Sequence, residues 1–178
     1  MIIPGNQNAS LSQEWYPWVK TELEKLGIKT IAKNMPDADL ARRQFWIPFI
    51  EQQLEGNEKS IVIGHSSGAV AALRYLEDHK LEGVVLIGAC YTDLGDEHEK
   101  KSGYYDDEWQ WDKIKQNAKW IVQFASQDDP YIPISEARFV HEKTDAEYHE
   151  YNDRGHFWGG VREFPEIIEA IKRKLKIK

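Results

Sequence analysis

The apolar positions of this chain follow two different rhythms. Short apolar runs without helical spacing predict strands over 1–3, 28–33, 60–65, 82–89, 120–125 and 146–151. Longer stretches repeat an apolar residue every three or four positions, which predicts helices over 13–26, 40–54, 67–79, 133–143 and 163–176. Because strands and helices alternate, we expect an α/β fold with a mostly parallel sheet of six strands and helices on both faces.

Three local features refine this expectation. The run 82–89 is apolar at almost every position, which is typical of a strand buried on both faces. The run 146–151 is polar enough to indicate a strand at the edge of the sheet. Pro48 lies inside the predicted helix 40–54, where it predicts a kink or a break.

Residues 91–118 interrupt the alternation. This stretch is long, acidic and aromatic, with a short helix predicted over 109–117. Long connections of this kind in compact domains are usually functional or disordered. We therefore interpret 91–118 as a cap-like insertion in a single domain that spans residues 1–178.

Charge and hydropathy argue against a nucleic-acid-binding protein and against a membrane protein. The chain carries 23 Lys and Arg against 30 Asp and Glu, a net charge of −7, which argues against a nucleic-acid partner. The basic run 172–178 suits the end of a terminal helix, where cations complement the helix dipole. No apolar stretch approaches the roughly 20 residues of a membrane span, and the first residues lack the features of a signal peptide. These features predict a cytoplasmic protein without a membrane partner. The single cysteine, Cys90, rules out an internal disulfide framework and is interpreted as a buried thiol.

The change of rhythm between strand 60–65 and helix 67–79 carries the first chemical signal. The five residues Gly64-His65-Ser66-Ser67-Gly68 match Gly-x-Ser-x-Gly, the nucleophile elbow that lifts a serine hydroxyl above a sheet. In this setting Ser66 is the candidate nucleophile, and the N–H of Ser67 is a candidate oxyanion donor at a helix N-terminus. The alternative is that a serine here only caps the helix.

A serine nucleophile needs a histidine base and a carboxylate, in the chain order serine, acid, histidine. His156 is the candidate base because it follows the last strand in a glycine-containing loop. His65 adjoins Ser66, but its side chain is expected to point away from that of Ser66. Asp129, which precedes a proline, is favoured as the acid, and the neighbouring Asp128 stays open as the alternative.

Two further parts of a site follow from position. The backbone N–H of Asn6, or next to it Gln7, follows the first strand and is the candidate second oxyanion donor, although a simple turn explains the same residues. Aromatic residues near the predicted site suggest an apolar substrate pocket. The candidate substrate contacts are Trp15, Trp109, Trp111, Phe157 and Trp158. The acidic run Asp93, Asp96, Glu97 and Glu99 offers charge for a cationic substrate group, with a solvated loop as the alternative.

Several stretches together resemble one family. The chain is similar to the small α/β-hydrolases related to retinoblastoma-binding protein 9, essentially from end to end. The matching stretches are "AKNMPD" (32–37), "IGHSSGA" (63–69), "TDLGDE" (92–97), "SGY" (102–104), "WQW" (109–111), "IVQF" (121–124), "DDP" (128–130) and "GHF" (155–157). The resemblance implies a compact α/β-hydrolase sheet and a triad of Ser66, Asp129 and His156.

The sequence thus predicts a serine hydrolase that cleaves small ester or amide substrates and needs no metal or organic cofactor. This sequence departs from the family pattern in a segment tied to a protein partner. The vertebrate protein has a Leu-x-Cys-x-Glu segment tied to retinoblastoma-protein binding, and here Gly56 stands where its cysteine would be, which argues against a pocket-protein partner. The alternative functions are a non-catalytic protein-binding module on a hydrolase fold and a flavodoxin-like nucleotide or flavin binder, for which the loop "PGNQNAS" offers only a faint phosphate-binding pattern.

Overall fold

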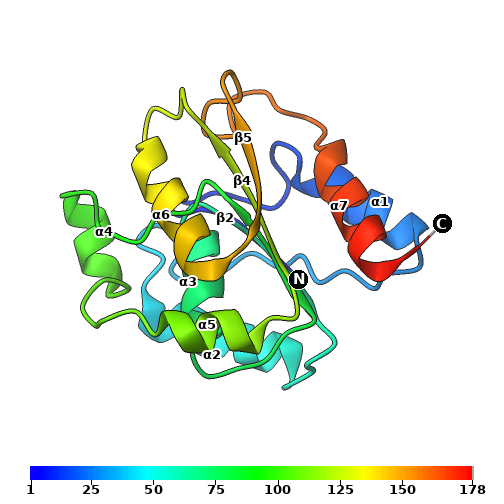
Figure 1. Cartoon of the computed structure of the whole chain (residues 1–178), viewed down its shortest axis with the longest axis horizontal. Helices are drawn as coiled ribbons and strands as arrows, with labels where there is room; N and C mark the ends of the chain where they lie inside the picture. The colour runs from blue at the N-terminus through cyan, green and yellow to red at the C-terminus, as the bar shows by residue number, and fades with distance from the viewer. Residues whose placement is uncertain (178) are drawn as a thin grey trace.

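A parallel β-sheet forms the centre of the structure, a computed structural model that describes residues 1–177 (Figure 1). Within those residues the sheet has five strands, in the spatial order β1-β2-β3-β4-β5. The strands are β1 (Ile2–Ile3), β2 (Ile61–His65), β3 (Gly83–Ile87), β4 (Ile121–Ser126) and β5 (Glu147–Tyr151). All four neighbouring pairs run parallel, as the alternation of strands and helices predicts.

The prediction of six strands is wrong, because residues 28–33 do not form one. This stretch passes beside β1, and the N–H of Ile2 donates to the carbonyl of Ile31 at 2.9 Å. A ladder needs further bonds on the same side, but β1 is only two residues long and Pro4 follows it. Proline has no N–H to continue the ladder, so β1 stays the edge of the sheet.

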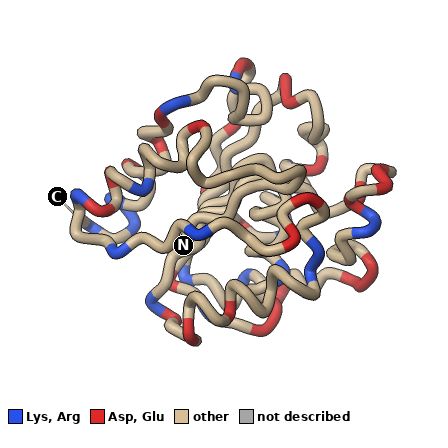
Figure 2. The backbone as a smooth tube through the Cα atoms, turned by 180° about the vertical axis from the view of Figure 1, so that it is seen from behind, with Lys and Arg blue, Asp and Glu red and all other residues tan. Residues whose placement is uncertain are grey.

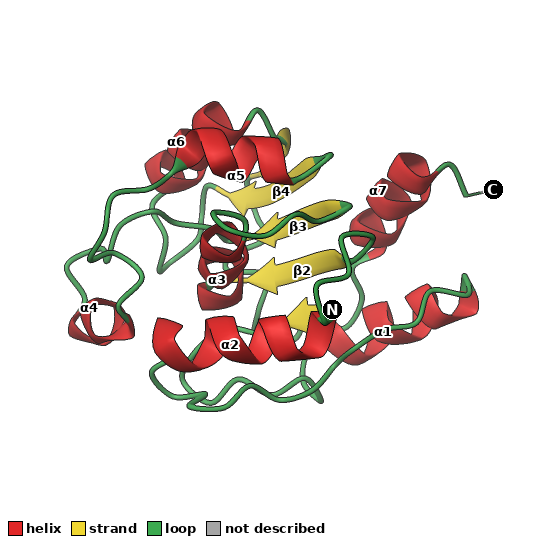
Figure 3. Ribbon diagram, turned by 90° about the horizontal axis from the view of Figure 1, so that it is seen from below, coloured by secondary structure: helices red, strands yellow, loops and turns green. Residues whose placement is uncertain are grey.

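Seven helices pack around the sheet within residues 1–177. They are α1 (Tyr16–Lys25), α2 (Arg43–Leu54), α3 (Ser67–Tyr75), α4 (Glu97–Ser102), α5 (Trp111–Asn117), α6 (Ile134–Thr144) and α7 (Pro165–Leu175). Figure 3 shows α1 and α7 on one side of the sheet and α2, α3, α5 and α6 on the other. The short helix α4 lies beyond the carboxyl ends of the strands in the same view.

Alternation along the strands supplies both faces of the core. Val84 and Leu86 belong to the cluster that packs against α2 and α3, whereas Val85 and Ile87 belong to the cluster that packs against α1 and α7. All five residues of β3 are buried. A strand covered on both faces has this continuous apolar character, so the prediction for 82–89 is confirmed.

Helix ends depart from the sequence pattern where the backbone turns left-handed. Glu14 has φ of 49°, and α1 therefore begins at Tyr16 rather than at residue 13. Ala41 has φ of 52°, and α2 begins at Arg43 rather than at residue 40. Helix α2 runs through Pro48 to Leu54, so the expected break does not occur.

The strand β5 lies at the other edge of the sheet, as its polar sequence predicts. Its residues are half-buried and its carboxylates hold neighbouring helices. Glu150 pairs with Arg138 of α6 at 2.6 Å, and Glu147 pairs with Arg173 and Lys174 of α7. Part of the basic run 172–178 is therefore neutralised by β5, and Figure 2 shows basic and acidic segments interspersed near this end of the chain.

The insertion 91–118 contains α4 and α5 and is attached firmly to α3. The guanidinium of Arg74 is fully buried and donates to the backbone carbonyls of Tyr104, Asp107 and Glu108. The same group pairs with the buried carboxylate of Glu77 at 2.6 Å. Among residues 1–177, no helix has the length and apolar character needed to cross a membrane.

Candidate active site

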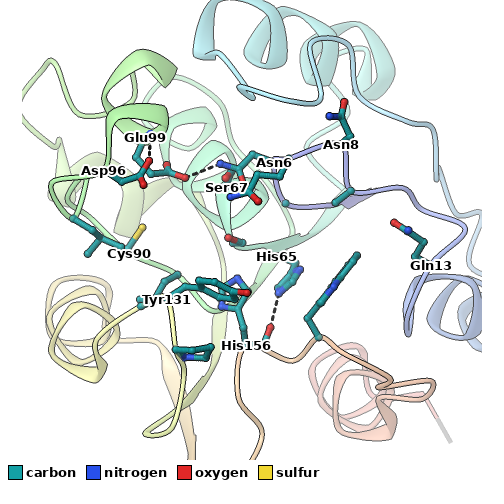
Figure 4. A pocket seen from close by; sticks show the side chains of 18 residues that line it. Asn6, Asn8, Gln13, His65, Ser67, Cys90, Asp96, Glu99, Tyr131 and His156 are labelled. Atoms are coloured by element: carbon teal, nitrogen blue, oxygen red, sulfur yellow. Dashed lines mark hydrogen bonds between the residues drawn. The ribbon is translucent and has the colours of Figure 1, made fainter.

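The loops that follow β1, β2, β4 and β5 surround one pocket of about 490 Å³ (Figure 4). In parallel sheets such loops meet at the carboxyl edge, which is where open α/β sheets place their ligands. The pocket is lined by residues from each of these loops and from the insertion, among them Asn6, Ser66, Cys90, Glu99, Tyr131 and His156. Residues far apart in the sequence therefore share one cavity.

Ser66 occupies a strained turn between β2 and α3. Its backbone has φ of 55° and ψ of −122°, and its N–H donates to the carbonyl of Ile87 at 2.8 Å. Neighbouring glycines allow this turn. A Cβ on Gly64 would lie 2.3 Å from the carbonyl oxygen of Gly68, and one on Gly68 would lie 2.4 Å from that of Ile3. The strand–turn–helix geometry of a nucleophile elbow is thus present.

His156 and Asp129 lie against each other at the pocket. The Nδ1 of His156 donates to the Oδ2 of Asp129 at 2.7 Å, and the two side chains are 10% and 3% exposed. The other carboxylate oxygen, Oδ1, accepts from the backbone N–H groups of Tyr131 and Ile132. These bonds fix the carboxylate and leave the Nε2 of the imidazole free of Asp129. Within residues 1–177 no hydrogen bond joins His156 to the hydroxyl of Ser66, which lines the same pocket.

Asp128 has a different environment from its neighbour. Its Oδ1 accepts from the hydroxyl of Ser126 at 2.5 Å and from the N–H of Gly155 at 2.8 Å. The Ser126 hydrogen bond, with backbone donors, lowers the pKa of the Asp128 carboxyl. Asp128 therefore braces the loop that carries His156, and Asp129 contacts the imidazole itself.

The loop after β1 approaches Ser66 closely. A Cβ on Gly5 would lie 3.3 Å from the Cβ of Ser66. The N–H of Gln7 donates to the carbonyl of Asp39, which leaves Asn6 as the candidate donor in this loop. The side-chain amide of Asn6 donates to Glu99 of α4 at 2.7 Å, and burial raises the pKa of Glu99 (Figure 4). Ser67 begins α3, so its N–H has no acceptor within the helix.

Of the five predicted substrate contacts, only Trp158 lines this pocket among the described residues. Trp15 and Phe157 are fully buried in the core on the α1 and α7 side. The indole N–H of Trp15 donates to the carbonyl of Phe157, and Phe157 has φ of 54°, a left-handed turn between two residues that line the pocket.

Trp109 and Trp111 also lie outside the set of residues that line this pocket. Their rings stack on each other at 5.0 Å, and the guanidinium of Arg74 lies 3.7 Å from the ring centroid of Trp109. The indole N–H of Trp109 donates to the carbonyl of Tyr91. Both tryptophans therefore hold the insertion against the core instead of facing the pocket.

Sequence reasoning missed two residues at the site. Tyr131 is 67% exposed, and its ring centroid lies 5.1 Å from that of His156. Its only local signal is its place two residues after Asp129. Gly88 directly follows β3 with φ of 57°, and a Cβ there would lie 3.1 Å from the imidazole of His156. A glycine at the carboxyl end of a central strand was the available signal for this close approach.

His65 also reaches the pocket, although its side chain was expected to point away from Ser66. The strand ends at His65 and the following backbone turns left-handed, so strand alternation does not continue to Ser66. Its ring centroid lies 4.8 Å from that of His156. Burial, followed by repulsion from His156, lowers the pKa of His65 to about 3, so its ring is neutral at pH 7.

Two other sequence-based interpretations concern metals and the cysteine. Within residues 1–177 no group of three or more His, Cys, Asp or Glu side chains could hold a metal ion. Cys90 is buried as predicted, and it lines the pocket near the hydroxyl of Tyr105 at 3.3 Å. Burial raises the pKa of the Cys90 thiol, which keeps the thiol protonated and a poor nucleophile.

Known proteins resemble this chain over almost its whole length. A family profile described as serine hydrolase matches residues 1–173. Serine hydrolase RBBP9 of Rattus norvegicus is 46% identical over 177 residues, which cover 98% of this chain and 94% of the rat protein.

Solved structures share the fold. The ydeN gene product from B. subtilis aligns with a TM-score of 0.89 at 26% identity, covering 98% of this chain and 97% of that one. Est1E from Butyrivibrio proteoclasticus, solved with bound ferulic acid, aligns with a TM-score of 0.75 at 14% identity over 98% of this chain and 86% of its own, a likeness of fold alone. The chain therefore belongs to the serine hydrolase family that includes RBBP9, and it has the α/β-hydrolase fold.

Proposed function

We propose that this hydrolase cleaves small ester or amide substrates through a catalytic triad of Ser66, His156 and Asp129. The observation that carries the proposal is the 2.7 Å hydrogen bond between His156 and Asp129 in the pocket that Ser66 also lines. A protein that only binds a partner needs none of these three side chains together. The triad therefore favours an enzyme over a non-catalytic binding module.

Each side chain has a role that its contacts support. The carboxylate of Asp129 holds the imidazole with its proton on Nδ1, so Nε2 of His156 is available as a base. His156 takes the proton of Ser66 as the serine oxygen attacks the substrate carbonyl, and returns it to the leaving group. Water activated by the same imidazole then releases the acid from the acyl-enzyme. A hydrogen bond between a catalytic nucleophile and its base is often long without substrate and tightens when substrate binds.

The oxyanion of the tetrahedral intermediate is held by the backbone N–H groups of Ser67 and Asn6. Ser67 offers the N-terminus of α3, where the helix dipole favours negative charge. Asn6 is held in the loop after β1 by the bond from its side chain to Glu99. A pocket of about 490 Å³ suits a small substrate, and Trp158 and Tyr131 supply its aromatic surface.

The absence of binding to the retinoblastoma protein and its relatives is a separate prediction, which depends on Gly56. Gly56 follows α2 with φ of 68°, a left-handed conformation that disfavours a residue with a side chain. This conformation supports the view that the motif cysteine has no place at this position.

Labelling with a fluorophosphonate probe tests the enzyme directly. We expect wild type to be labelled and Ser66→Ala to remain unlabelled, because the probe reacts with an activated serine. Ser12→Ala is the matched control, since Ser12 is exposed and its side chain bonds only to Ser10 among residues 1–177. This variant should be labelled like wild type. A folded wild type that resists the probe would instead support the binding module.

A panel of acyl and aminoacyl esters and amides, tested on wild type and Ser66→Ala, then identifies the acyl and leaving groups. Turnover that survives in Ser66→Ala would move the nucleophile elsewhere.

A further inference from the structure

Two buried hydrogen bonds connect α1, the residue before Ser66 and the loop of His156. The hydroxyl of Tyr16 lies 2.7 Å from Nδ1 of His65, and Nε2 of His65 lies 2.8 Å from the backbone carbonyl oxygen of His156. Tyr16 also lies beside the backbone of Gly5, whose N–H acts to lower the pKa of the Tyr16 hydroxyl against the larger effect of burial. Tyr16 and His65 are 0% and 2% exposed, so water does not compete for these bonds.

The acceptors determine where each proton lies. The carbonyl of His156 can only accept, so Nε2 of His65 carries the proton. Because burial lowers the pKa of His65 to about 3, the ring is neutral and its Nδ1 is a lone pair. Tyr16 therefore donates to Nδ1, and burial raises the pKa of Tyr16, which keeps that hydroxyl protonated. Both hydrogen bonds thus donate in one direction, from Tyr16 to His65 and from His65 to the carbonyl of His156.

Aromatic neighbours prevent the His65 ring from turning. The ring of Trp158 stacks on it with an interplanar angle of 11°, and Trp15 meets it edge-on at 5.9 Å. Figure 4 shows the imidazole between the elbow and the loop of His156. The ring is thereby held in the orientation that its two hydrogen bonds require.

We propose that Tyr16 and His65 are positioning residues that hold the oxyanion loop and the loop of the base in register around Ser66. The proposal rests on the proposed function, in which Asn6 and His156 act on either side of the serine. Tyr16 lies beside Gly5, which precedes Asn6, and His65 precedes Ser66 and bonds to His156, so the pair contacts all three parts of the site. A displacement of about 1 Å in such a group can lower turnover about 10²-fold.

The alternative is that the pair only stabilises the core. Kinetics at a temperature well below the unfolding transition separates the two roles. Tyr16→Phe keeps the ring and removes the hydroxyl, and we expect kcat for p-nitrophenyl acetate to fall about 10- to 100-fold while KM changes less than about twofold. The matched control is Tyr104→Phe, because the buried hydroxyl of Tyr104 has no hydrogen-bond partner among residues 1–177. Its kcat should stay within about twofold of wild type.

A comparison of two His65 variants adds a rescue. Glutamine can still donate an amide N–H to the carbonyl of His156, whereas leucine cannot, so His65→Gln should retain at least about ten times more kcat than His65→Leu. Equal losses in the two variants would overturn the proposal. So would a Tyr16→Phe enzyme that loses thermal stability but keeps the wild-type kcat.

Nitrogen-15 NMR of wild type tests the proton assignment without any substitution. We expect His65 to stay neutral, with its proton on Nε2, from pH 5 to 8. Titration of His65 in that range, or a proton on Nδ1, would overturn the assignment. A wild type that neither reacts with the fluorophosphonate nor turns over ester would overturn the proposed function and this role together, whereas an active wild type with an equally active Tyr16→Phe overturns this role alone.

Discussion

Adjacent residues of one type have separate tasks at this site. Asp129 contacts the imidazole of His156. Asp128 accepts from Ser126 and Gly155 and thereby fixes the loop that carries His156. Composition and spacing cannot separate these neighbours, because each follows the same strand within two residues. The backbone turn at 128–132 aims one carboxylate at the histidine and the other at the loop.

We predict that Asp129→Asn lowers kcat for a small ester by about 10⁴-fold, since an amide opposite Nδ1 favours the tautomer whose Nε2 cannot take the serine proton. Stability should change by less than about 1 kcal/mol, because the amide keeps the shape of the side chain. Steady-state kinetics and urea denaturation measure the two effects.

Asp128→Asn is the companion variant. Its amide oxygen can still accept from Ser126 and Gly155, so we expect a loss in kcat of less than about tenfold. If Asp128→Asn is the more damaging change, the acid role belongs to Asp128.

At the scale of elements, the junction of β2 and α3 determines where the serine lies. All nine residues of α3 are buried, so the helix packs against its surroundings on every side. Its first turn passes so close to β1 and β2 that only hydrogen atoms fit at Gly64 and Gly68. The glycines of the elbow thus serve packing between elements as well as the turn itself.

Gly68→Ala should destabilise the protein by about 3 kcal/mol or more, because the new methyl group would overlap the backbone carbonyls of Ile3 and Pro4. Gly27→Ala is the comparison, because φ is 78° there and, among the described residues beyond its two chain neighbours, an added Cβ would meet no heavy atom within 4 Å. Only the left-handed backbone then costs about 1–2 kcal/mol. Urea denaturation of both variants measures the difference. Equal destabilisation would show that α3 can shift away from β1.

At the scale of the whole molecule, the insertion 91–118 closes one side of the pocket and is attached to the core by a buried arginine. The insertion residues that line the pocket are Leu94, Asp96 and Glu99. The insertion is connected to the core through Arg74, whose side chain binds three carbonyls of the segment 104–108. Because Arg74 and Glu77 are both buried, removing Arg74 leaves the Glu77 carboxylate with the longer ion pair to Arg43, at 3.7 Å, in place of the 2.6 Å pair.

Arg74→Leu should therefore lower the free energy of unfolding by about 3–5 kcal/mol. The double variant Arg74→Leu with Glu77→Leu should recover part of this loss, because no unpaired charge remains buried. Arg138→Leu is the exposed control and should cost less than about 1 kcal/mol. Arg74→Leu as mild as Arg138→Leu would contradict the view that the insertion depends on this pair. Urea denaturation of the four proteins gives the comparison.

Local pattern alone determined the alternation of strands and helices, the buried central strand, the polar edge strand and the elbow around Ser66. These features follow from burial and backbone conformation at positions close in sequence, which periodicity and glycine placement report directly. The tertiary structure decided what depends on contacts between distant segments. It left 28–33 outside the sheet because β1 ends before Pro4, and it placed Asp129 against His156. It packed four of the five candidate aromatics in or against the core, where they do not line the pocket. An apolar side chain has the same signature in a core and in a pocket wall, so only the packing of the whole chain separates the two.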